Sequence, residues 1–193
     1  SIDPLNALRF RLREIGEKDR VDVIITNPPF GGEEEKGIQG NFPEDKKTGE
    51  TALLFLQMIM RKLRRQVRAG FAPARAAVVV PNGTLFGDGV CARIKEELLK
   101  DFNLHTIIRL PDGVFSPYTN IPTNILFFDR SGPAQDIWYY QQPLPEGRKN
   151  YTKTQPIQFE EFADCLKWWN NRTENDLAWR VPTAEILAAN CNL

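Results

Sequence analysis

The sequence lacks the features that mark membrane-spanning, secreted and metal-binding proteins. Its apolar runs stay far below the roughly 20 residues that cross a bilayer, and its first residues contain no apolar core of a secretory signal. The three cysteines, Cys91, Cys165 and Cys191, are odd in number and widely spaced, so they indicate neither a disulfide framework nor a zinc site. We therefore predict a cytoplasmic protein with no metal and no membrane partner.

An excess of either charge is also missing. The 193 residues include 25 basic side chains, 25 acidic side chains and a single histidine. Proteins that hold nucleic acid alone usually carry a basic excess, because neutralising phosphates supplies most of the non-specific affinity. A function on nucleic acid therefore requires a partner that contributes much of the binding. Aromatic residues are plentiful, with twelve Phe, four Tyr and four Trp, which is typical of a folded domain with a substantial core.

Apolar patterns along the chain alternate between those of strands and those of helices. Short β-branched runs predict buried strands, and apolar residues at steps of three and four predict helices. We expect strands at 21–26, 76–81, 104–110, 123–128 and 137–141, and helices at 53–67, 91–102 and 159–169. This succession predicts βαβ units around a parallel sheet. The connection between the third and fourth strands has no helical stretch, so that pair can be antiparallel.

Polar segments separate these elements. The glycine-rich stretch 31–48 predicts a long mobile loop, and its run Glu33-Glu34-Glu35 indicates a lid or a subunit contact. Five basic residues between 61 and 68 are more typical of a solvated helix face than of a phosphate-binding stripe. The tail 170–193 is less regular and predicts a short helical ending.

The sharpest motif is Asn27-Pro28-Pro29-Phe30, called the NPPF segment here, which follows the first expected strand. Open α/β sheets place ligands at such strand ends. The Asn27 side-chain oxygen and the Pro28 carbonyl are two acceptors for the N–H groups of a conjugated amine, whose lone pair would then localise on nitrogen. The prolines fix the backbone that holds this carbonyl, and Phe30 can stack on a base swung out of its helix. The segment is also compatible with an ordinary proline-rich turn.

The NPPF segment with Gly31 and Gly32 resembles motif IV of the N6-adenine DNA methyltransferases. Further stretches at 76–86, 104–115 and 123–128 resemble the modification subunit of type I restriction–modification systems, and 137–140 with the 159–169 helix fits its C-terminal part. The resemblance covers most of the chain. It implies methylation of adenine N6 in DNA with S-adenosylmethionine, using Asn27, Pro28, Pro29 and Phe30 for catalysis and Asn27 also for cofactor contact. Expected partners are DNA with a flipped adenine, a specificity subunit and a restriction subunit.

Part of the family pattern has no match in this sequence. The family's cofactor site uses a glycine-rich turn after the first strand of the sheet and an acidic residue after the second. The resemblance therefore implies an α/β fold that is the second half of a Rossmann-like class I methyltransferase sheet, strands four to seven, with flanking helices and a C-terminal helical tail. We expect residues 1–134 to form this half-domain and 135–193 a C-terminal extension with a strand and helices. Such a fragment would bind S-adenosylmethionine poorly or not at all.

The sequence leaves the roles of several residues and two alternative functions open. Phe115 is a candidate for a second aromatic lining the adenine pocket, or else a loop residue packed on the sheet edge. Asn124 is more typical of a strand end than of a pocket, and we expect His105 to be structural. A protein-glutamine N-methyltransferase shares the Asn-Pro-Pro motif and the same chemical problem. A truncated module that lacks catalysis and keeps only assembly surfaces is the other alternative.

Overall fold

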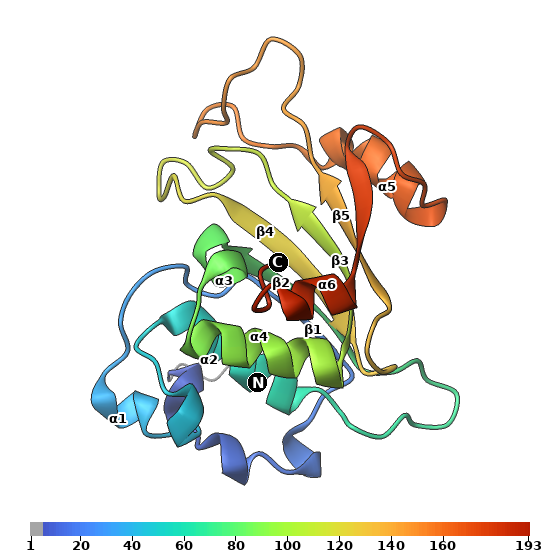
Figure 1. Cartoon of the computed structure of the whole chain (residues 1–193). Helices are drawn as coiled ribbons and strands as arrows, with labels where there is room; N and C mark the ends of the chain where they lie inside the picture. Colours follow the sequence, from blue (N-terminus) through green and yellow to red (C-terminus); the bar gives the residue numbers. More distant parts are fainter. Residues whose placement is uncertain (1–5) are drawn as a thin grey trace.

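A computed structural model describes residues 6–193, and its centre is one mixed β-sheet (Figure 1). The six strands lie in the order β1-β2-β4-β3-β5-β6. Their bounds are β1 (Val23–Thr26), β2 (Arg75–Pro81), β3 (Asn103–Arg109), β4 (Thr123–Asp129), β5 (Asp136–Gln141) and β6 (Ala178–Pro182). All five predicted strands are present, each within two residues of its predicted bounds.

Strand directions define one edge of this sheet at which the parallel strands end. β1 is parallel to β2, and β3 is parallel to β5. β4 is antiparallel to both of its neighbours, β2 and β3, so the predicted antiparallel connection is confirmed. β1, β2, β3 and β5 therefore run in one direction and end at the same side, which we call the carboxyl edge. An antiparallel strand inserted between two parallel ones fits the predicted strands four to seven of a class I methyltransferase sheet.

One face of the sheet is covered by helices. Figure 1 shows α2 (Thr51–Lys62), α4 (Val90–Asp101) and α6 (Thr183–Ala188) together on this face. Their apolar residues pack on alternate residues of the strands, which project to one side because side chains in a strand have a period of two. Buried members of this core include Leu56, Ile94, Val78, Leu126 and Ile186.

Helix α2 ends earlier than the pattern of apolar residues predicts. The prediction extended it to Val67, but Leu63 takes an extended backbone and the helix stops at Lys62. Val21 donates its N–H to the Lys62 carbonyl at 2.9 Å, and its own carbonyl accepts from Arg64 N–H at 2.9 Å. A parallel bridge between Leu63 and Val21, just before β1, therefore replaces the next helical turn. Most of the basic run lies beyond the helix, which corrects its assignment to a helix face.

The opposite face of the sheet is covered only in part. α5 (Ala163–Asn170), preceded by a 3-10 helix at Phe159–Phe162, packs Cys165 and Trp168 against Ile108 and Tyr140. No helix of residues 6–193 covers the side of this face nearer β1. Accordingly, Ile25 is 81% exposed and Val23 is 45% exposed. Two apolar hollows of about 320 Å³ and 270 Å³ lie along this face and share Phe127 and Trp169 in their walls.

The segments between these elements carry short helices. They are α1 (Lys36–Gln39), α3 (Asn82–Phe86) and 3-10 helices at Ala7–Arg9, Leu12–Glu14, Glu17–Asp19 and Glu44–Lys46. The predicted loop 31–48 thus contains α1, and its Phe42 is 5% exposed and packs with Leu8 and Leu54. This apolar anchor holds the loop against the N-terminal turns.

The C-terminal residues extend the main sheet. β5 pairs with β3, and β6 pairs with β5, so both continue the sheet formed by the earlier strands. The tail contains β6 as well as the predicted helical ending, α6. The division at residues 134 and 135 stays a prediction. Within residues 6–193, no helix combines the length and hydropathy needed to cross a membrane.

Candidate active site

The NPPF segment lies at the carboxyl edge, directly after β1. β1 ends at Thr26, opposite Val78 of β2, and the two prolines that follow have no N–H with which to continue the ladder. Pro28 is buried, whereas Asn27 is exposed. In the part of the chain that the structure describes, no group forms a hydrogen bond with the Asn27 side chain. The amide is therefore available to a ligand at the sheet edge.

The fold brings together the two aromatic residues that the sequence predicts for the site. Phe30 and Phe115 have ring centroids 4.8 Å apart and an interplanar angle of 70°, an edge-to-face contact. Phe115 comes from the loop 110–122 after β3, which leaves the sheet at the same edge as the NPPF segment. Both rings are half-buried. Phe115 also packs against the buried cluster that contains Ile108 and Leu110, so the core beneath the loop supports its position.

Two asparagines connect further strand ends at this edge. Asn124, 1% exposed at the start of β4, donates its side-chain amide to the Oδ1 atom of Asn82 at 3.0 Å. Asn82 is the first residue of α3 and follows β2 directly; its backbone N–H donates to the Pro122 carbonyl at 2.8 Å. The expected strand-end role of Asn124 agrees with this bond. Our sequence analysis missed Asn82 as its partner, although its place after a parallel strand was a usable signal.

A second loop is hydrogen-bonded to the loop of Phe115 through Tyr151. We call this contact the Tyr151 clasp. Tyr151, from the segment 142–158 after β5, is 0% exposed, and its N–H donates to the Asp112 carbonyl at 3.3 Å. Gly113 has a φ of +77°, and a Cβ there would lie 2.7 Å from the Tyr151 carbonyl oxygen. The Tyr151 hydroxyl donates to the Glu161 carboxylate; burial, together with this bond, raises the pKa of Tyr151 to about 12. The sequence analysis missed this residue.

His105 and the basic residues between 61 and 68 lie away from the NPPF segment. His105 packs against Trp169 with ring centroids 5.8 Å apart, and burial, followed by the nearby Arg172, lowers its pKa. In the basic run, Arg64 and Arg68 both pair with Asp22. Residues 6–193 contain no group of three or more potential metal-binding side chains, and the three cysteines are free and buried.

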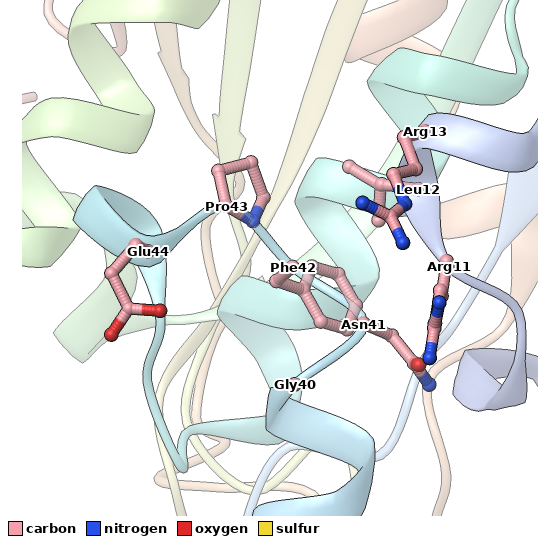
Figure 2. Close-up of a pocket in the computed structure, with 8 residues that line it drawn as sticks. All are labelled: Arg11, Leu12, Arg13, Gly40, Asn41, Phe42, Pro43 and Glu44. Atoms are coloured by element: carbon pink, nitrogen blue, oxygen red, sulfur yellow. The ribbon is translucent and has the colours of Figure 1, made fainter.

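A cavity of about 530 Å³ lies between the N-terminal turns and the loop 40–44 (Figure 2). Figure 2 shows Phe42 near its centre, with Arg11 and Arg13 on one side and Glu44 on the other. Its lining residues, 11–13 and 40–44, include no predicted site residue. This cavity is therefore separate from the candidate site at the carboxyl edge.

Comparison with known proteins identifies the family. A family model described as N-6 DNA Methylase matches residues 4–193. The chain belongs to this family. It is 52% identical over 182 residues to the type I restriction enzyme EcoEI methylase subunit of Escherichia coli, covering 91% of this chain and 36% of that protein. The EcoKI methylase subunit of Escherichia coli strain K12 is 35% identical over 183 residues, covering 86% of this chain and 32% of that protein.

Solved structures agree. The modification subunit of a putative type I restriction enzyme from Vibrio vulnificus is 69% identical, with a TM-score of 0.92 over 95% of this chain and 38% of that chain. A putative class I S-adenosylmethionine-dependent methyltransferase from Listeria monocytogenes, 17% identical, has a TM-score of 0.52 over 79% of this chain and 43% of that chain, which shows the fold alone. The resemblance to type I modification subunits and the partial Rossmann-like fold are confirmed. This N-6 DNA methylase chain spans about a third of the length of its curated relatives.

Proposed function

We propose that this chain is the second half of the catalytic domain of a type I modification subunit, the half that binds the base to be methylated. The whole protein would transfer a methyl group from S-adenosylmethionine to N6 of an adenine flipped out of DNA. The exposed Asn27 amide, which has no hydrogen-bond partner among residues 6–193, carries the proposal together with the Phe30–Phe115 pair beside it. Relatives named as type I methylase subunits, at 52% and 35% identity, support it.

The chemistry of adenine requires what the NPPF segment offers. The N6 lone pair is delocalised into the ring, so the amine is a weak nucleophile. The Asn27 side-chain oxygen and the Pro28 carbonyl would accept the two N–H groups and localise the lone pair on nitrogen. Pro29 helps to keep these acceptors in place, and Phe30 would hold the base by stacking, with Phe115 behind it. S-adenosylmethionine supplies the activated methyl group.

The chain presents only one side of a cofactor site. Asn27 stands at the end of β1, and β1 is the outermost strand of the sheet, with its neighbour β2 on one side. Ile25 in the middle of β1 is 81% exposed, which is unusual for a large apolar residue of a central methyltransferase strand. These features fit a domain in which further strands pair with β1 and supply the glycine-rich turn. Asn27 would contact the cofactor, and the complementing half would hold it.

Partners follow from the same proposal. The net charge is zero, and Glu33, Glu34 and Glu35 follow the NPPF segment closely, so this chain alone has little attraction for phosphate. A specificity subunit would read and hold the DNA target, and a restriction subunit would cleave unmodified DNA. The match to the N-6 DNA Methylase model favours a base over a protein glutamine as substrate.

The test is an Asn27→Ala substitution in the full-length protein assembled with its specificity subunit. Removing one preorganised polar group from a reaction centre typically lowers the rate by about 10²–10³-fold. We expect a loss of this size in tritiated methyl transfer to target DNA, with assembly on DNA retained. Asn171→Ala, at an exposed asparagine that follows α5, is the matched control and should methylate normally. Methyl transfer by Asn27→Ala near the wild-type rate would contradict the proposal.

A further inference from the structure

The segment 142–158 leaves the sheet beside the candidate active site. β3 and β5 are parallel, with Arg109 opposite Gln141, so the loops that follow them begin next to each other. Figure 1 shows both loops extending beyond the sheet at the same end. Ligands of open α/β sheets bind at this edge. A duplex placed with its flipped base at Phe30 would therefore lie near segment 142–158.

The position of this segment relative to Phe115 is set by the Tyr151 clasp. Tyr151 is bonded to Asp112, lies against Gly113, and places its hydroxyl on Glu161. The Arg148 guanidinium carbon lies 5.2 Å from the centroid of the Tyr151 ring, and its Nη1 atom lies 3.7 Å from a Glu161 oxygen. Residues adjacent to Tyr151 are consequently held near the site loop.

Two residues after Tyr151, a closed turn presents a lysine. Thr152 N–H donates to the Gln155 carbonyl at 3.2 Å, and Gln155 N–H donates to the Thr152 carbonyl at 3.1 Å. The Thr152 hydroxyl oxygen also accepts from Gln155 N–H at 3.2 Å. These bonds close the base of the turn and leave Lys153 and Thr154 at its exposed tip. A lysine ammonium and a hydroxyl are both common donors to phosphate oxygens.

Charge distinguishes this segment from the other loops of the carboxyl edge. Residues 27–35 contain three glutamates and no basic residue, and residues 110–122 contain Asp112 and no basic residue. Segment 142–158 contains one acidic residue, Glu146, and three basic residues, of which Arg148 lies against Glu161 while Lys149 and Lys153 are exposed. Phosphates that flank a base held at Phe30 would be repelled by the first two loops. Positive charge on the third places attraction for the DNA backbone on one side of the site.

We propose that the turn 152–155 contacts the DNA backbone, with Lys153 on a phosphate beside the flipped adenine and Lys149 near a neighbouring phosphate. The contact rests on the proposed function and adds a positioning role: Lys153 holds the duplex, and the Tyr151 clasp relates that hold to Phe115. Contacts of this kind carry no base information, so they weaken binding of every sequence alike when removed.

The test uses the full-length modification protein assembled with its specificity subunit. Binding of a fluorescent duplex is measured over a range of salt concentrations for Lys153→Ala, Lys149→Ala, the double variant and Lys153→Arg. Each phosphate contact contributes about 0.9 to the slope of log K against log salt concentration. We expect Lys153→Ala to lower the slope by about one, the double variant by about two, and Lys153→Arg to keep it. Target and non-target duplexes should change equally.

Lys18→Ala is the matched control. Lys18 is exposed and lies before β1, at the sheet edge opposite the site, so the substitution removes the same charge from the wrong place. A slope for Lys153→Ala equal to that of Lys18→Ala would overturn the proposal, and a reduced slope would support it. Methyl transfer by the wild-type protein, measured on the same duplex, tests the proposed function separately. Failure of that assay and failure of the salt test are thus distinguishable.

Discussion

At the scale of single residues, the candidate site depends on two phenylalanines from separate loops. Phe30 follows β1 and Phe115 follows β3, and their rings meet edge to face at 4.8 Å. In that arrangement Phe115 supports Phe30 from the side. On the proposed function, the aromatic ring of Phe30, rather than its bulk, would hold the planar base.

Substitution of Phe30 separates stacking from simple packing. Stacking of a base on an aromatic side chain contributes about 1–3 kcal/mol. We expect Phe30→Ala to lower methylation about 10-fold to 100-fold, and Phe30→Tyr and Phe30→Trp to lose much less because each keeps a stacking face. The measurement is kcat/KM for methyl transfer by the full-length protein. Equal losses for all three variants would rule out stacking.

At the scale of elements, the loops at the carboxyl edge are joined to each other. Asn124 bonds Asn82 across the starts of β4 and α3, and Tyr151 clasps the loop that carries Phe115. Gly113 allows the second contact in two ways: its φ of +77° suits glycine, and the missing side chain leaves room for the Tyr151 backbone. These contacts connect the loops of the carboxyl edge to one another.

Gly113→Ala and Gly147→Ala test this clasp as a matched pair. Both glycines have a φ of +77°, but a Cβ at Gly147 would have no heavy atom of residues 6–193 within 4 Å. Each substitution costs about 1–2 kcal/mol for the left-handed backbone. The contact with backbone atoms should make Gly113→Ala lower the free energy of unfolding by about 1–3 kcal/mol more. Chemical denaturation of the two variants measures the difference, and equal losses would show that the clasp is loose.

At the scale of the whole molecule, the sheet is covered unevenly. α2, α4 and α6 cover one face, whereas α5 packs on the other face against β4, β3, β5 and β6 and leaves β1 exposed (Figure 1). The hollows along that face are lined mostly by apolar residues, and β1 has no partner on its outer side in residues 6–193. An exposed apolar face with an open strand edge is typical of a surface that another part of a protein covers.

Cofactor affinity tests the half-domain proposal at this scale. Isothermal titration of S-adenosylmethionine into the 193-residue chain should give binding at least about 100-fold weaker than into the full-length protein, a difference of about 2.7 kcal/mol. The expected reason is that Asn27 is the one cofactor contact we assign to this chain. Full-length protein carrying Asn171→Ala serves as the control for intact binding. Tight binding by the isolated chain would contradict the assignment.

The helices and strands that could be predicted are those marked by a local pattern of apolar residues. The first five strands and α4 follow from apolar runs and from apolar residues at steps of three and four, which depend on neighbouring residues only. α2 was predicted too long, because its last turn is replaced by a bridge between Val21 and Leu63, residues far apart in the chain. β6 was missed because it is five residues long and Arg180 interrupts its apolar residues. The NPPF segment and Phe115 were found as candidates, and their catalytic roles stay predictions.

The sequence by itself determined the first five strands, α4 and the family resemblance, because each depends on consecutive residues. The chemistry of the NPPF segment stays a prediction. Only the tertiary structure decided that β4 lies between β2 and β3, that Phe30 meets Phe115, and that Tyr151 clasps Gly113. Strand order and loop contacts depend on how packed faces and closed loops bring distant residues together. A side-chain period of two or 3.6 specifies which face of a strand or helix is buried. It does not specify which other element packs on that face.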